Sequence, residues 1–277
     1  MTIKKTIVLI LTLMLALFVA ACGDDTKKEA ANDSATEKKT YIIGTTALFK
    51  DIVLAAKDDF EDKSGCKLEV KVFDDAISPN VALKESSIDA TFHQNAPYLL
   101  QYNKERGTDL MQYEQGLVTT FYGLYSNKIK NLSELKDGAK ISVPSDASNR
   151  VRALKMLEKL GLIKLNPDVA LPTKLDIVEN PKKLEIIEMD GWSIVNTLVD
   201  VDCGTTSSSV AVKAEIDPKT AIARDGSEET GEYAMILVIN KDKSGDKLTK
   251  LLYDSFRTEN VKKALDEKYL GGIVPLF

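Results

Sequence analysis

The chain has 277 residues, of which 44% are hydrophobic and 29% charged, and its formal net charge is −5. This composition is typical of a folded globular protein, and acids and lysines alternate without forming a basic stripe, so we expect no nucleic-acid partner. One histidine and three cysteines exclude a histidine-rich metal site and a disulfide framework.

The N-terminal segment has the pattern of an export signal followed by a linker. Lys4 and Lys5 precede an apolar run, and small residues then lead to Cys22. The run is too short for a comfortable membrane span, so we expect residues 1–21 to be a removed signal peptide. An ordinary signal peptide with an incidental Cys22 is the alternative to lipidation at this cysteine. Residues 22–39 are polar and expected to form a flexible tether.

The next segments alternate between strand and helix patterns. Residues 40–46 predict a buried strand, residues 47–65 have apolar residues at helical spacing, and residues 66–73 alternate like a second strand. A short helix starting near Pro79 and a strand over 88–93 follow. Strands separated by helices indicate βαβ units and a parallel sheet.

The same order restarts after a predicted surface stretch over 124–138. Its strands are expected at 139–144, 184–189 and 201–207, its helices at 145–161 and 192–200, and a strand at 233–241 and helices over 246–272 complete the chain. The fold class is therefore α/β, with two lobes that each contain a mixed, mostly parallel sheet flanked by helices. Ligands bind beyond the carboxyl ends of such strands, so we expect His93 and the serines 207–209 to face one cleft.

The residues for catalysis are largely missing. No HExxH, GxSxG, P-loop or GxGxxG motif occurs. Ser207 and His93 could form a nucleophile and base, but no elbow motif surrounds the serine. We therefore predict no enzyme activity, no metal and no cofactor.

Arg152 is the most informative charged residue. The stretch "VPSDASNRVRAL" (143–154) predicts a strand end, capping oxygens and a helix start, where free amide groups attract an anion. A cation in or near the first turn opposes the helix dipole. It is either a clamp for a ligand carboxylate, which guanidinium geometry suits, or a surface arginine paired with Asp146 or Glu158.

His93 and Tyr98 lie in "IDATFHQNAPYL" (88–99) and have two interpretations each. His93 is a pocket residue or a packed ring, and Tyr98 is a cleft wall or a core aromatic.

Several passages together resemble the NlpA-type family of substrate-binding lipoproteins, the methionine-binding components of ABC importers. They include "SPNVAL", "IDATFHQNAPYL", "GLYSNKIKNLSELKDGAKISVPSDASNRVRAL", "DIVENPKKLEIIE" and "GGIVP". The resemblance implies a type II periplasmic-binding-protein fold, with lobe 1 over 40–128 and 233–277 and lobe 2 over 129–232. It also implies a hinge near 126–130 and 231–233, and a small-molecule ligand delivered to a permease and its ATPase.

The resemblance further implies binding residues. The family's carboxylate-binding arginine falls on Arg152 and its Pro-Tyr tyrosine on Tyr98, and we also assign Asn149, in the segment of Arg152, to the site. His93 stands where the family has phenylalanine, and Asn95 where it has histidine.

Other positions depart from the family. Ala76 replaces a tyrosine, and Ser207 and Met235 each replace an asparagine. Because losing a buried polar partner costs about 1–3 kcal/mol, the side-chain pocket is expected to differ from that of the relatives.

The resulting prediction is a binding protein anchored to the cell membrane through lipid on Cys22, facing the periplasm or the exterior. It would capture methionine or a related small amino acid or short peptide, with Arg152 clamping the carboxylate. The alternative is a surface lipoprotein of the same fold that has lost transport and binds envelope or host partners.

Overall fold

A computed structural model describes residues 39–277. The predicted signal peptide over 1–21, the lipidation site at Cys22 and all but the last residue of the predicted tether lie outside these residues. From residue 39 onward, no helix is both long and apolar enough to cross a membrane.

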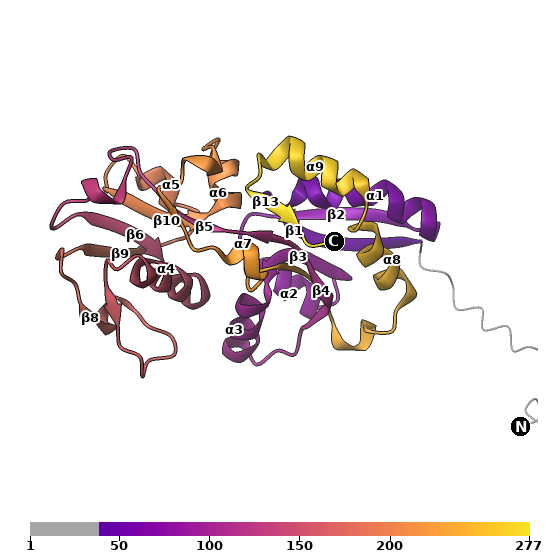
Figure 1. Ribbon diagram of the computed structural model, residues 1–277. Helices are drawn as coiled ribbons and strands as arrows, with labels where there is room; N and C mark the ends of the chain where they lie inside the picture. Colours follow the sequence, from indigo (N-terminus) through magenta and orange to yellow (C-terminus); the bar gives the residue numbers. More distant parts are fainter. Residues whose placement is uncertain (1–38) are drawn as a thin grey trace, which may run out of the picture. The chain divides into compact units, whose positions relative to one another are not determined.

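The strands form two larger sheets and a small hairpin, and the two sheets occupy different ends of the described region in Figure 1. The first sheet has the order β13-β4-β12-β3-β1-β2. Its strands are β1 (Thr40–Thr46), β2 (Lys67–Phe73), β3 (Ala90–Asn95), β4 (Met111–Thr120), β12 (Met235–Ile239) and β13 (Ile273–Pro275).

The second sheet has the order β11-β5-β10-β6-β9. Its strands are β5 (Tyr122–Tyr125), β6 (Lys140–Pro144), β9 (Glu185–Met189), β10 (Cys203–Ser207) and β11 (Ala223–Arg224), while β7 (Lys164–Leu165) and β8 (Ile177–Glu179) form the hairpin.

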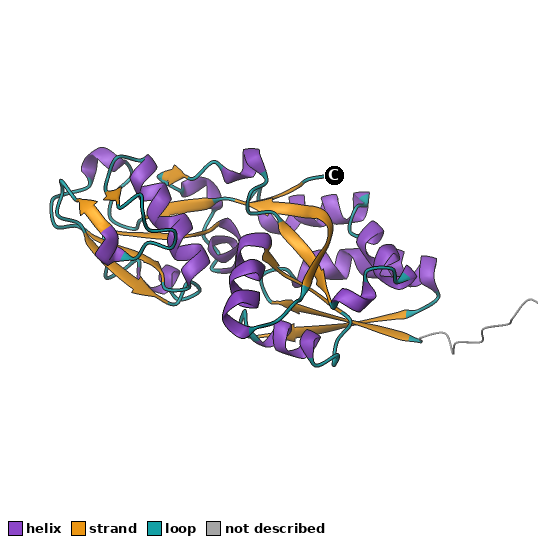
Figure 2. Cartoon of the chain, turned by 90° about the horizontal axis from the view of Figure 1, so that it is seen from below, coloured by secondary structure: helices purple, strands orange, loops and turns teal. Residues whose placement is uncertain are grey.

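Helices pack against both sheets, as the view in Figure 2 shows. They are α1 (Lys50–Ser64), α2 (Ser78–Lys84), α3 (Ala96–Arg106), α4 (Ala147–Lys159), α5 (Ile194–Thr197), α6 (Ser208–Lys213), α7 (Ser227–Thr230), α8 (Lys247–Ser255) and α9 (Glu259–Tyr269). Helix α1 buries Ile52, Val53, Ala56 and Phe60, whose spacing places them on one face. Gly65 ends it with φ +67°, a left-handed conformation that glycine adopts without steric cost.

Each sheet has its own apolar core. Phe92 on β3 packs against Phe49 and Phe256, with ring centroids 5.9 and 4.7 Å away, within the core of the first sheet. Leu124 and Leu154 belong to the core of the second sheet. The fold is therefore α/β with two lobes, as predicted.

The expectation of mostly parallel pairing holds for part of each sheet only. β1 pairs in parallel with β2 and β3, and β6 pairs in parallel with β9 and β10. β12 returns from the second sheet and lies between β3 and β4, antiparallel to both. Because this strand is not joined to β3 by a helical crossover, its direction is not constrained to be parallel.

The chain changes sheets earlier than the predicted boundary at residue 128. β4 ends at Thr120 and β5 begins at Tyr122, so the crossing lies at Phe121. The predicted surface stretch over 124–138 is wrong at its start, because Leu124 and Tyr125 are buried in β5. The predicted helix over 192–200 is shortened to α5, since turns occupy the residues on both sides of it.

No disulfide joins Cys66 to Cys203. Both thiols are buried, Cys66 in the core of the first sheet and Cys203 in the core of the second.

Candidate functional site

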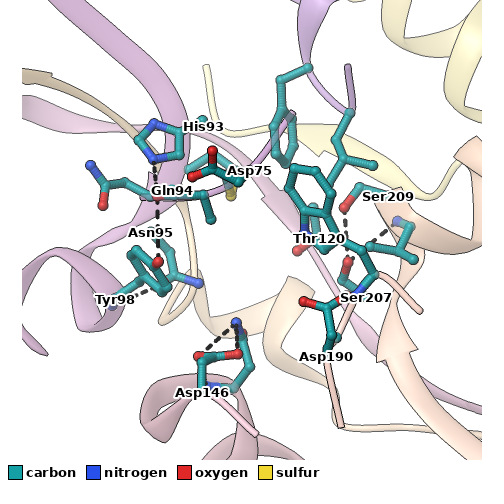
Figure 3. Close-up of a pocket in the computed structure, with 18 of the residues that line it drawn as sticks. Asp75, His93, Gln94, Asn95, Tyr98, Thr120, Asp146, Asp190, Ser207 and Ser209 are labelled. Atoms are coloured by element: carbon teal, nitrogen blue, oxygen red, sulfur yellow. Dashed lines mark hydrogen bonds between the residues drawn. The ribbon is translucent and has the colours of Figure 1, made fainter. Parts of the chain in front are cut away.

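A cavity of about 340 Å³ lies where residues of both sheets meet. Figure 3 shows His93, Gln94, Asn95 and Tyr98 on one side of it and Ser207, Ser209 and Asp190 on the other. The residues predicted to bind a ligand all line this cavity: His93, Asn95, Tyr98, Asn149, Arg152, Ser207 and Met235.

The strand ends explain why these residues converge. Asn95 is the last residue of β3, and Ser207 is the last residue of β10. Helix α4, which carries Asn149 and Arg152, begins shortly after β6 ends. Met235 starts β12, which runs antiparallel to β3 and so brings its first residue opposite Asn95. The carboxyl ends of parallel strands thus deliver most of the site.

Arg152 is buried and held by partners that the sequence did not predict. Its Nε donates to Asp225 Oδ2 at 2.7 Å, and its Nη2 donates to the carbonyl oxygen of Thr120 at 2.8 Å and to the Ser227 hydroxyl. The guanidinium carbon lies 4.5 Å from the ring centroid of Tyr122 and 4.0 Å from that of Tyr233. The ion-pair partner is therefore Asp225.

The predicted alternatives for this ion pair, Asp146 and Glu158, are wrong for physical reasons. Asp146 caps α4 and accepts from the backbone N–H of Asn149 at 3.0 Å. Glu158 accepts from the backbone N–H of Leu165 at 2.8 Å. Both carboxylates are engaged locally, whereas Asp225 is brought to Arg152 from 73 positions away.

One nitrogen of the Arg152 guanidinium is left over. Counting every partner between residues 39 and 277, Nη1 makes no hydrogen bond, although the residue is only 3% exposed. Nη1 is not among the fully buried side-chain atoms that lack a partner, so this nitrogen keeps some access to solvent. Because Arg152 lines the cavity, a ligand oxygen is the partner that this nitrogen can take.

His93 is both packed and part of the cavity wall. Its Nε2 lies 3.1 Å from the carbonyl oxygen of Ala76, which can only accept, so Nε2 carries the proton. Its Nδ1 then accepts from the Thr91 hydroxyl at 2.9 Å. Burial lowers the pKa of His93 to about 4, against the opposing effects of the Ala76 hydrogen bond and of Asp75. The ring is therefore neutral at pH 7.

The Ser/His pairing is absent among the described residues. The Ser207 hydroxyl lies 2.9 Å from that of Ser209, and both ring nitrogens of His93 are occupied by other partners. Ser207 also caps α6 by accepting from the backbone N–H of Val210.

Neutral burial of His93 predicts a pH-dependent stability. The pKa of His93 is about 4 in the folded protein and 6.5 in the unfolded chain. As the pH falls below 6.5, the unfolded chain binds a proton at this residue and the folded protein does not. The free energy of unfolding therefore decreases as the pH falls from 6.5 toward 4. We expect the wild type to lose about 2–3 kcal/mol more than His93→Gln between pH 7 and pH 4. Urea unfolding of both proteins at the two pH values measures this. Equal losses in both proteins would contradict it.

Asn95 and Tyr98 have structural roles beside their place in the wall. Asn95 Oδ1 caps α3 by accepting from the backbone N–H of Tyr98 at 2.9 Å. The Tyr98 hydroxyl donates to the carbonyl oxygen of Ala76 at 3.4 Å, and burial raises the pKa of Tyr98. Asn149 donates its backbone and side-chain N–H groups to Asp146. Met235 supplies an apolar wall and is 4% exposed.

Four carboxylates and several aromatic rings of the wall were not predicted as site residues. The carboxylates are Asp74, Asp75, Asp146 and Asp190, and the aromatic residues are Phe49, Tyr122 and Trp192. The sequence held a signal for Asp74, Asp75 and Asp190, since each closely follows a strand of the expected sheets.

Comparison with known proteins places this chain in a family. The model of the NlpA lipoprotein family matches residues 42–277. The chain belongs to the NlpA lipoprotein family. The D-methionine-binding lipoprotein MetQ of Salmonella typhi is 33% identical over 274 residues, which cover 98% of this chain and 97% of MetQ.

Two further relatives of this NlpA chain bear on its function. A nutrient-binding protein from Burkholderia cenocepacia, solved bound to methionine, superposes with a TM-score of 0.81 at 32% identity over 86% of this chain and 100% of its own. Outer membrane lipoprotein 2 of Mannheimia haemolytica is 32% identical over 95% of each chain. These relatives are binding proteins and lipoproteins, which confirms the predicted family, its fold and the expectation of a protein that is not an enzyme.

Proposed function

We propose that this protein is the lipid-anchored substrate-binding component of an ABC importer. It captures methionine or a related small amino acid or short peptide between its two lobes. The buried Arg152, with Nη1 left without a partner in the described chain, is the observation that carries this proposal, because it fits a ligand carboxylate. The methionine-bound relative supports the class of ligand.

The remaining wall residues have roles within the same proposal. Tyr98 and Met235 give the ligand side chain an apolar surface, and Asn95, Asn149, Ser207 and His93 border its polar groups. The lobes follow the two sheets and comprise about 40–120 with 233–277 and 122–232, and the chain segments that join the sheets act as the hinge. Cys22 carries the lipid and holds the protein at the membrane, where it delivers the ligand to a permease and its ATPase.

A binding panel tests the ligand class. Calorimetry with the twenty amino acids and methionine-containing dipeptides should identify at least one ligand with a dissociation constant of about 1 µM or below. Mass spectrometry of the natively purified protein should detect the same ligand. Amines that lack a carboxylate serve as the control and should not bind. Failure of every ligand with a free carboxylate would refute the proposal.

The relative called outer membrane lipoprotein 2 favours a second candidate. This candidate is a surface lipoprotein of the same fold that no longer takes part in transport and instead binds envelope or host partners. Transport separates the two functions: deleting the gene abolishes uptake of the ligand found in the panel if the importer role holds, and leaves uptake unchanged if the surface role holds.

A further inference from the structure

The charges around the cavity are unbalanced for a methionine zwitterion. Four carboxylates line it, on Asp74, Asp75, Asp146 and Asp190. Among the described residues of the wall, Arg152 is the only lysine or arginine. Its charge is already paired with Asp225 at 2.7 Å, and His93 is neutral. The wall is therefore negative, and a ligand with net positive charge complements it.

The four carboxylates differ in how many oxygens remain available. Asp75 accepts from the backbone N–H groups of Ile77 and Ser78 through Oδ1 and from the Ser78 hydroxyl through Oδ2. Asp146 accepts from Asn149 through both oxygens. These two aspartates act as local caps.

Asp74 and Asp190 have free acceptor oxygens. No hydrogen bond from residues 39–277 reaches Asp74, which follows β2 of the first sheet. Asp190, after β9 of the second sheet, uses Oδ1 to accept from the backbone N–H groups of Trp192 and Ser193, and no partner within the same residues engages Oδ2. The two available carboxylates thus belong to different sheets.

An amino acid with a neutral side chain can pair with only one of Asp74 and Asp190. Its carboxylate takes Nη1 of Arg152 and its α-ammonium takes one aspartate. Both aspartates are exposed to solvent, so the second one stays hydrated when a neutral ligand is bound, whereas a ligand with a second cation gains the attraction of both carboxylates. Phe49, Tyr98 and Trp192 also line the cavity, and aromatic faces attract organic cations. The described carboxylates do not gather into a group of three that could hold a metal ion.

We propose that the ligand is an α-amino acid whose side chain carries a positive charge, with Asp74 and Asp190 as the carboxylates that receive its α-ammonium and its side-chain cation. This inference rests on the proposed function and narrows its ligand class. The side-chain cation is a guanidinium, an ammonium or a sulfonium, and the choice of ligands below separates these.

Pairs of ligands matched in shape test the charge alone. Calorimetry at pH 7 compares arginine with citrulline, lysine with 2-aminoheptanoic acid, and S-methylmethionine with 2-amino-5-methylhexanoic acid. In at least one pair we expect the cationic member to bind at least about tenfold more tightly, the effect of one charge-assisted hydrogen bond. The pair with the largest ratio identifies the cation.

Two variants locate the effect. Asp74→Asn and Asp190→Asn should each lower the affinity for the cationic member about 5- to 20-fold, in the range of a hydrogen bond to a charged group. Asparagine keeps an Oδ1 that can cap the loop after β9. Asp242→Asn removes the same charge from an exposed position outside the cavity and should change the affinity less than about twofold.

The outcomes separate this inference from the function beneath it. If neutral members bind as tightly as cationic ones while binding still requires Arg152, the inference is overturned and the amino-acid-binding function stands. If no ligand with a free carboxylate binds, both fall. If the cationic members bind more tightly than the neutral ones but neither Asp74→Asn nor Asp190→Asn reduces their affinity, the assignment of these two aspartates is overturned. Thermal melting of each variant confirms that it is folded.

Discussion

Arg152→Ala should lower the affinity for the best carboxylate ligand at least about 100-fold. The guanidinium is 3% exposed and lines the cavity, so its hydrogen bond to a ligand carboxylate forms away from water. Removing such a charged partner costs about 3 kcal/mol, which corresponds to about 100-fold in the dissociation constant. Calorimetry with the ligand identified in the binding panel measures the change.

Two controls distinguish the loss of the clamp from other effects. Arg152→Ala leaves Asp225 without its cation, and that charge would itself repel a ligand carboxylate. The double variant Arg152→Ala/Asp225→Ala removes both charges and should lose affinity to a similar extent. Arg150, on the same helix, lies outside the cavity wall, so Arg150→Ala should change the affinity less than about twofold. An affinity within about threefold of the wild type in the double variant would show that Arg152 is not the clamp.

Asp225→Ala is expected to lower the free energy of unfolding by about 3–5 kcal/mol. The Arg152 and Asp225 side chains are 2% and 9% exposed, so the substitution leaves a guanidinium buried without its counter-charge. Asp225 also accepts from the backbone N–H of Tyr122 at 3.0 Å and from Ser227. The same side chain therefore supports the start of β5 next to the point where the chain changes sheets. Urea unfolding at pH 7 gives the free energy.

An exposed ion pair of similar length is the matched control. Lys164 and Glu179 approach to 2.6 Å but are 61% and 62% exposed. Glu179→Ala should therefore cost less than about 1 kcal/mol, because water screens such pairs. A similar loss in both variants would mean that burial does not set the strength of the Arg152–Asp225 pair.

Local patterns predicted much of the fold. The strand over 40–46 matches β1, and the helix over 47–65 contains α1, because apolar residues recur at the spacing of each element. The elements between residues 96 and 125 were missed. Strands β4 and β5 follow each other with only Phe121 between them, so no turn signal separates two strands that belong to different sheets.

The residues predicted to bind a ligand line the cavity, but the ion-pair partner of Arg152 was not predicted. His93 and Ser207 were found because they lie at the ends of strands, where open sheets bind ligands, and Asn95 was found through the resemblance to the NlpA-type family. The partner of Arg152 was predicted wrongly because sequence neighbours were the only candidates that spacing could offer.

Periodicity, caps and motifs are local properties, and they were enough to predict the family and most of the strands and helices outside residues 96–125. Which charges meet depends on the tertiary structure. Asp225 directly follows β11 and meets Arg152 of α4 across 73 positions of the chain. Asp74 and Asp190 follow strands of different sheets and line one cavity. Contacts between residues so distant in the chain depend on how the chain passes from one sheet to the other and back. No short stretch of sequence carries that information.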